Sequence, residues 1–221
     1  MIRRTGPALL LTLFLISAAT GQDEDKKFMS GPQKGEDLPG PCEVFNINGT
    51  EYKGRFHCLV CEYGFDPVVM IFTTEPKAGE DAVLTSLVRR LDASIEQNQE
   101  ARLHAFMVVL SPQFRSSAID SKAQERADII KETDARNELL KRLENRATAM
   151  KSVILGVTGA EGPKIYKLNP KAELTVVFYK QLKVVENYTY QPGKMTQDDV
   201  DSIIDKVEKT LKAAKKRPEK K

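Results

Sequence analysis

An unbroken apolar run predicts the central strand of the fold. Residues 68–72 read Val-Val-Met-Ile-Phe and are bounded by Pro67 and Thr73. Such a run is typical of a short strand that is buried on both faces, in a sheet covered by helices. Residues 80–97 follow with apolar side chains spaced as on one side of a helix, namely Leu84, Leu87, Val88, Leu91 and Ile95. A strand followed by a helix that packs on it is therefore the first predicted unit.

A second strand and a charged helical region come next. Residues 103–110 form a second buried strand, which is expected to lie parallel to the first with a right-handed crossover, because a helix joins the two. Residues 117–151 are highly charged and helical in pattern, and a break near Thr133-Asp134 would divide them into two helices. Their few large apolar residues are Ile129, Ile130, Leu139, Leu140 and Leu143. Residues 152–157 are predicted to be a strand.

The last third of the chain predicts a hairpin and a closing helix. Residues 173–179 and 183–188 are strand-like and are separated by a short turn, which suits an antiparallel pair. Thr196 is a good N-cap, and Asp198 and Asp199 suit the positive end of a helix dipole. The core-facing positions of this helix are Val200, Ile203, Ile204, Val207 and Leu211.

A further hairpin is predicted in front of the central strand. Residues 43–47 alternate apolar and polar side chains, Asn48-Gly49 is a strong turn signal, and residues 52–56 are expected to return as the partner strand.

The two ends of the chain differ in composition from the predicted domain, residues 41–211. Residues 1–21 combine Arg3 and Arg4 with an apolar run and a small-x-small cleavage pattern, as in a secretory signal. Residues 22–40 have almost no apolar side chains and are interpreted as a flexible leader. Residues 212–221 are rich in lysine and are expected to fray. The chain is therefore predicted to be exported to a periplasmic or extracellular compartment, with no membrane span after cleavage.

The charge balance argues against a nucleic-acid partner. The chain has 34 Lys and Arg against 31 Asp and Glu, and removal of residues 1–21 takes away two arginines. A net charge near plus one gives no electrostatic basis for binding nucleic acid. We find no phosphate-binding loop or Ser-His-Asp pattern, and we predict no cofactor. An unknown protein partner or a thiol substrate remains as the expected partner.

The order of the elements resembles the thioredoxin fold, with an added N-terminal hairpin as in redoxins and peroxiredoxin-like proteins. Tyr166-Lys167-Leu168, followed by the strand that opens at Thr175, is similar to the corresponding redoxin segment. The chain looks most like uncharacterised, exported thioredoxin-like proteins of bacteria. This resemblance implies a three-layer α/β/α sandwich with a mixed central sheet and an N-terminal β-hairpin extension.

The usual active site of that family is missing from this chain. In thioredoxins the reactive CxxC lies where the central strand meets the next helix, whereas residues 73–79 of this chain contain no cysteine. The resemblance also implies a cis-proline before Thr175, where this chain has Leu174. Both departures favour a non-catalytic binding or structural domain, and whether the chain is an enzyme stays open.

A CxxC occurs elsewhere, as Cys58-Leu59-Val60-Cys61, and Cys42 is the third cysteine of the chain. Because the motif precedes the central strand, activation by the dipole of the following helix is not expected there. Three interpretations stay open. The first is a structural disulfide, either Cys58 with Cys61 or Cys42 with one of them. The second is a thiol-disulfide oxidoreductase that uses Cys58 and Cys61, with Cys42 as resolving thiol. The third is a metal site of Cys42, His57, Cys58 and Cys61.

Overall fold

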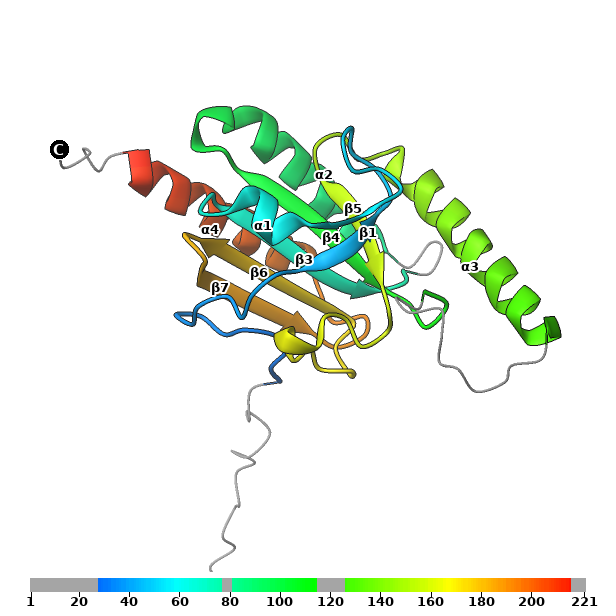
Figure 1. Ribbon diagram of the computed structural model, residues 1–221. Coiled ribbons are helices and arrows are strands. Elements are labelled where there is room, and N and C mark those ends of the chain that lie inside the picture. The colour runs from blue at the N-terminus through cyan, green and yellow to red at the C-terminus, as the bar shows by residue number, and fades with distance from the viewer. Residues whose placement is uncertain (1–27, 77–80, 115–125, 216–221) are drawn as a thin grey trace, which may run out of the picture.

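The computed structural model describes residues 28–76, 81–114 and 126–215, and its described strands form one seven-stranded sheet in the order β2-β1-β5-β4-β3-β6-β7 (Figure 1). The strands are β1 (Glu43–Asn46), β2 (Phe56–Cys58), β3 (Val68–Thr74), β4 (His104–Leu110), β5 (Ile154–Thr158), β6 (Leu174–Lys180) and β7 (Lys183–Tyr190). The helices are α1 (Leu59–Tyr63), α2 (Ala82–Gln97), α3 (Arg126–Ala147) and α4 (Gln197–Lys215), with short 3-10 helices η1 (Gln99–Ala101) and η2 (Lys164–Tyr166).

The middle of the sheet agrees with the sequence prediction. Strand β3 pairs parallel with β4 and antiparallel with β6, and β4 pairs parallel with β5. The apolar residues of β3, Val68 to Phe72, are no more than 1% exposed. Strands β6 and β7 form the expected antiparallel hairpin, in which Gln181 and Leu182 both have positive φ, as in a tight two-residue turn.

Different elements pack on the two faces of the sheet. Val69 and Ile71 point to the face on which α2, α3 and α4 pack, and form one apolar core with Leu87 of α2 and Ile203 of α4. Val68, Met70 and Phe72 point to the other face, where Leu59 of α1 and Tyr166 of η2 complete a second core. The predicted α/β/α sandwich with a mixed sheet is confirmed. The chain has a thioredoxin-like fold.

The closing helix begins as predicted. Thr196 Oγ1 accepts the Asp199 N–H at 3.3 Å, and the Asp199 carboxylate accepts the Thr196 N–H at 2.8 Å, which is a reciprocal N-terminal cap. The predicted core positions of α4 are all buried. Helix α4 continues to Lys215, so the predicted start of the frayed tail at residue 212 is wrong, and residues 216–221 lie outside the described residues. Within the described part of the chain, none of the helices has the length and apolar character needed to cross a bilayer.

The predicted flexible leader is wrong for residues 28–40, which lie against the sheet. Gly35 donates its N–H to Val184 O at 2.9 Å and Leu38 donates to Leu182 O at 2.8 Å, so the segment pairs with the edge of β7. Ser30 is 2% exposed and accepts a hydrogen bond from Thr175 at 2.7 Å. Backbone pairing orders a segment that has few apolar side chains. Residues 1–27, including the predicted signal, lie outside the described residues.

Two other details differ from the sequence prediction. The partner of β1 is Phe56–Cys58 rather than residues 52–56, because Asn48 does not close a two-residue turn. The Asn48 side chain accepts the Leu155 N–H at 2.7 Å and donates to Val153 O at 3.0 Å. These two bonds join the loop after β1 to β5. Helix α3 runs through Thr133 without the predicted break, and residues 117–125 lie outside the described residues.

Candidate functional site

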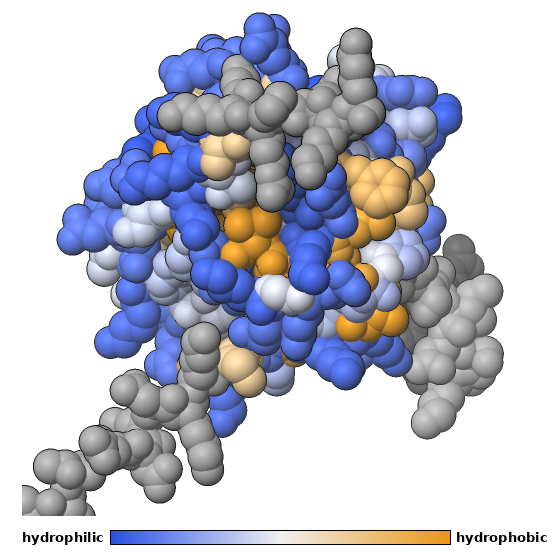
Figure 2. All heavy atoms as spheres, turned by 90° about the vertical axis from the view of Figure 1, so that its left-hand side faces the viewer, coloured by the Kyte–Doolittle hydropathy of each residue, from blue (hydrophilic) through white to orange (hydrophobic). Residues whose placement is uncertain are grey.

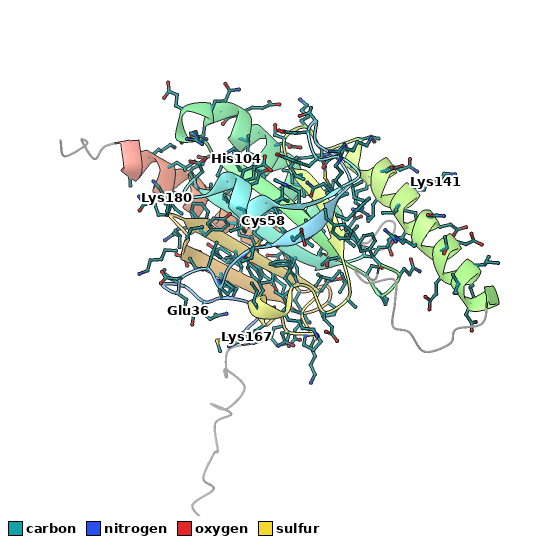
Figure 3. The ribbon with its side chains drawn as sticks, in the orientation of Figure 1. Glu36, Cys58, His104, Lys141, Lys167 and Lys180 are labelled. Atoms are coloured by element: carbon teal, nitrogen blue, oxygen red, sulfur yellow. A yellow bond between two sulfur atoms is a disulfide. The ribbon has the colours of Figure 1, made fainter. Side chains whose placement is uncertain are left out.

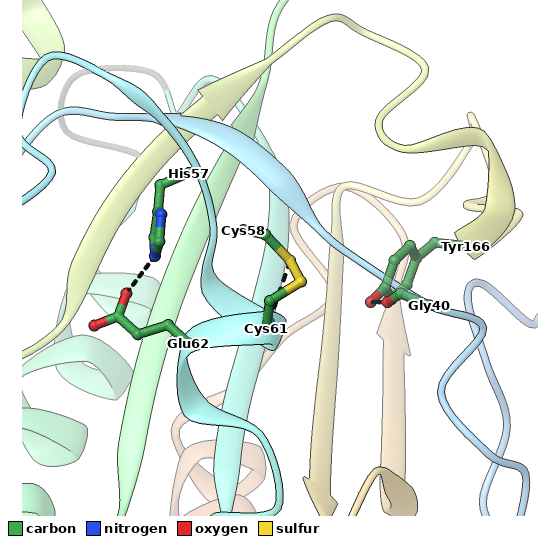
Figure 4. Close-up of a disulfide and its surroundings, with 6 residues drawn as sticks. All are labelled: Gly40, His57, Cys58, Cys61, Glu62 and Tyr166. Carbon is green, nitrogen blue, oxygen red and sulfur yellow. Dashed lines mark hydrogen bonds and ion pairs between the residues drawn. A yellow bond between two sulfur atoms is a disulfide. The ribbon is translucent and has the colours of Figure 1, made fainter.

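Cys58 and Cys61 form a disulfide at the junction of β2 and α1 (Figure 4). Cys58 is the last residue of β2 and the N-cap of α1, with extended backbone angles. Leu59 and Val60 are buried and fix the short helix on the sheet. The helix ends at Tyr63, and Gly64 follows with a φ of 53°, a conformation that glycine adopts without strain. The motif therefore lies in a strand–CxxC–helix arrangement.

The two cysteines of this disulfide differ in exposure and in hydrogen bonding. Cys61 is exposed, whereas Cys58 is partly buried against the second core. The Cys61 backbone N–H donates to Cys58 Sγ at 3.1 Å. We expected no activation of this motif by the dipole of the helix that follows the central strand. The contact at Cys58 is a different one, because it comes from a single N–H in the first turn of α1.

A contact between His57 and Glu62 brackets the disulfide in the sequence. His57 Nε2 lies 2.9 Å from Glu62 Oε2, and these two residues directly precede Cys58 and directly follow Cys61 (Figure 4). The His57 ring stacks on Tyr52, with ring centroids 3.5 Å apart and planes 4° apart. The contacts fix β2 and α1 to each other around the disulfide.

The carboxyl end of α1 is anchored to β4. Tyr63 stacks on His104 with ring centroids 4.2 Å apart, and His104 Nε2 lies 3.3 Å from Asp66 Oδ2. Arg102 pairs with the same carboxylate oxygen at 2.9 Å. Burial lowers the pKa of His104, and this effect outweighs the hydrogen bond that the ring donates to Asp66, so the ring is neutral at neutral pH. Cys58 and His104, both labelled in Figure 3, lie on the face of the sheet that α1 covers.

Cys42 is a buried free cysteine next to the disulfide, and its backbone carbonyl accepts the Leu59 N–H at 3.3 Å. Its side chain is 0% exposed in the second core, and burial raises the pKa of its thiol to about 12. A resolving cysteine must form a thiolate, so this environment disfavours the role that the sequence suggested for Cys42. Among the described residues, no three His, Cys, Asp or Glu side chains gather as metal ligands, and the predicted set Cys42, His57, Cys58 and Cys61 is not assembled.

The junction of β3 and α2 has a different chemistry. Glu75 there accepts hydrogen bonds from Arg142 of α3 at 2.8 and 3.2 Å, and Pro76 follows it. This junction lies on the face covered by α2, α3 and α4, whereas α1 and the disulfide lie on the other face. Cys58 and Cys61 are therefore not at the tip of α2.

Sequence reasoning missed the helix start at Cys58 and the His57–Glu62 pair. The run His-Cys-Leu-Val-Cys-Glu-Tyr-Gly carries a signal for the first: a glycine follows a short stretch that begins at a possible cap. The His57–Glu62 contact has no such signal, because either polar side chain could also point to solvent.

Comparisons with known proteins agree with the fold. No protein-family model matches the chain, and no curated protein matches its sequence. A solved structure of an uncharacterised conserved protein from Geobacillus kaustophilus is 13% identical, with 89% of this chain and 88% of that chain covered and a TM-score of 0.50. The thioredoxin domain of a thiol-disulfide oxidoreductase from Bacteroides vulgatus is 11% identical, with 81% and 99% covered and a TM-score of 0.45. Copper-bound yeast Sco1 is 11% identical, with 85% and 96% covered and a TM-score of 0.45. At these identities the likeness shows the fold alone.

Proposed function

We propose that the protein exchanges thiols and disulfides through Cys58 and Cys61. The observation that carries this proposal is the difference between the two bonded cysteines. Cys61 is an exposed residue and Cys58 is a partly buried one, and Cys58 Sγ accepts the Cys61 N–H at 3.1 Å. A hydrogen bond to a charged sulfur is stronger than one to a neutral sulfur, so this N–H stabilises Cys58 most when it is a thiolate.

The geometry assigns a different role to each cysteine. A substrate thiolate attacks Cys61 Sγ and forms a bond to it, while the Cys58–Cys61 bond breaks and its electron pair leaves on Cys58 as a thiolate. A second substrate thiolate then attacks the substrate sulfur of the mixed disulfide, and Cys61 leaves as a thiolate. The substrate loses two electrons and gains a disulfide, and the protein takes up those electrons as a dithiol. A disulfide substrate is reduced by the same steps in reverse.

The disulfide closes too small a loop to be a major support of the fold. Its cysteines are separated by 3 in sequence. The chain-entropy model gives such a loop about 2 kcal/mol of stabilisation, at the low end of the usual range. The domain also has two extensive apolar cores. We therefore expect the reduced protein to remain folded, as a redox cycle requires.

Exposed aromatic residues on either side of the motif favour a protein as the substrate. Phe56, at the start of β2, is 43% exposed and Phe65, just after α1, is 71% exposed. Figure 2 shows apolar patches among hydrophilic side chains on one face of the molecule. Exposed aromatic side chains of this kind contribute contact area in protein interfaces. The proposal includes export, because an oxidising compartment is where such a disulfide forms and persists.

An insulin-reduction assay with a dithiol reductant tests the proposal. The wild-type protein should accelerate insulin precipitation, and Cys58→Ser and Cys61→Ser should each abolish the acceleration. Cys42→Ala is the matched control, since its thiol is buried, and should keep the activity. If the wild type and both single variants give the rate of the reductant alone, with insulin and with a scrambled-disulfide substrate, the disulfide is structural. The alternative of a non-catalytic binding domain would then hold.

A further inference from the structure

A cavity between α2 and α3 lies apart from the disulfide. Its volume is about 710 Å³, within the range of small-molecule sites in proteins. Figure 1 shows the C-terminal end of α3 against the body of the molecule, while its N-terminal end projects outward. The residues of that C-terminal end that line the cavity are Arg142, Leu143, Asn145 and Arg146. The cavity is on the face of the sheet opposite to α1, next to the junction of β3 and α2.

The lining divides into an apolar floor and a basic rim. Leu84 and Val88 of α2, Met107 of β4 and Leu143 of α3 line the cavity and are at most 9% exposed. Met150 adds a second methionine, and methionine side chains adapt their shape to a flexible apolar ligand. A cavity with this floor would take an alkyl chain.

Three arginines line the same cavity against a single acidic residue, Glu75. Arg142 is fixed by Glu75 and by Gln113 Oε1, which it contacts at 3.1 Å, and Arg146 pairs with Asp81. Arg89 is exposed and has no ion-pair partner within the described ranges 28–76, 81–114 and 126–215. The rim therefore carries a surplus of positive charge, with Arg89 available to an external anion.

We propose that this cavity binds an amphipathic organic anion, with the alkyl chain on the apolar floor and the carboxylate at Arg89. The apolar floor suits the alkyl chain, and the basic rim suits the carboxylate. An apolar cavity without such a rim would not distinguish anionic from neutral or cationic ligands. This site is independent of Cys58 and Cys61, so its occupancy does not rely on thiol exchange.

Isothermal titration with dodecanoate, below its micelle concentration, tests the proposal on the full chain. We expect one saturable site with a dissociation constant on the order of tens of micromolar. Dodecanol should bind more weakly, and dodecyltrimethylammonium weakest of all. Arg89→Glu should weaken dodecanoate binding about fivefold or more, because it replaces attraction by repulsion.

Arg90→Glu is the matched control, because Arg90 is the next residue of α2 but pairs with Asp201 of α4 instead of lining the cavity. It should leave the affinity unchanged. Thr85→Phe, which places a larger side chain in the lining, should abolish binding while circular dichroism shows a folded protein. Equal binding of the three dodecyl compounds, an equal effect of Arg89→Glu and Arg90→Glu, or no saturable binding of dodecanoate would each overturn the proposal.

Discussion

Asp92 is a buried carboxylate that fixes the start of β5, and its removal should destabilise the fold severely. It lies on α2, is 5% exposed, and accepts backbone N–H groups from Lys151 at 3.1 Å, Ser152 at 2.7 Å and Val153 at 2.8 Å. In Asp92→Ala all three donors lose their acceptor. Val153 is fully buried, so water cannot replace the carboxylate there, whereas Lys151 is exposed and can be rehydrated.

The expected decrease in the free energy of unfolding follows from how well water can reach each of these donors. A buried donor left without a partner costs about 1–3 kcal/mol, and bonds to a charged acceptor lie at the upper end. Two donors that water reaches poorly therefore give a loss of about 4 kcal/mol, a large part of the ~10 kcal/mol typical of a domain. Urea unfolding followed by far-ultraviolet circular dichroism measures it. Asp92→Asn, which keeps one acceptor oxygen, should lose about half as much.

Glu96→Ala is the matched control for this prediction. Glu96 is on the same helix and lies 3.6 Å from Lys151 Nζ, but its side chain is 51% exposed. An exposed ion pair contributes roughly 0–1 kcal/mol, so the variant should unfold close to the wild type. If Asp92→Ala changed the free energy of unfolding no more than Glu96→Ala, the proposed anchoring of β5 by the carboxylate would be refuted.

Two further predictions concern the packing of the cores. Gly156→Ala should lower the free energy of unfolding by about 1–3 kcal/mol, because the added Cβ would lie 2.7 Å from Val44 Cγ2. Urea unfolding should show a smaller decrease when the same substitution is made in a Val44→Ala background. Cys42 should react with a thiol reagent only after unfolding. Because folding raises the pKa of Cys42 from 9.0 to about 12, the stability it contributes is full below pH 9.0 and is lost as pH rises toward 12. The free energy of unfolding should therefore fall less steeply above pH 9.0 in Cys42→Ala; identical slopes would contradict this.

The parts of the fold that local patterns encode could be predicted from the sequence. The apolar run in β3 and the spacing of Leu84, Leu87 and Leu91 in α2 depend on residues close in the chain, so their strand and helix were predicted. The segment from residue 28 to residue 40 was not, because its order comes from backbone hydrogen bonds to β7, which lies far away in sequence.

The candidate site could be predicted in part. The CxxC spacing identified Cys58 and Cys61, but not which cysteine is exposed, since that depends on how Leu59 and Val60 fix α1 to the sheet. The cavity at Arg89 had no sequence signal, because its lining combines residues from α2, α3 and β4 that meet only in the folded chain.

The most direct test of the proposed exchange is to locate the first mixed disulfide. The oxidised protein is mixed with reduced glutathione and quenched with N-ethylmaleimide, and fragmentation mass spectrometry then maps both labels. We predict glutathione on Cys61 and maleimide on Cys58, because the more exposed cysteine is attacked and the cysteine whose sulfur accepts a hydrogen bond leaves. Glutathione on Cys58 would contradict the assigned roles, and an unlabelled, intact disulfide under strongly reducing conditions would contradict the exchange itself.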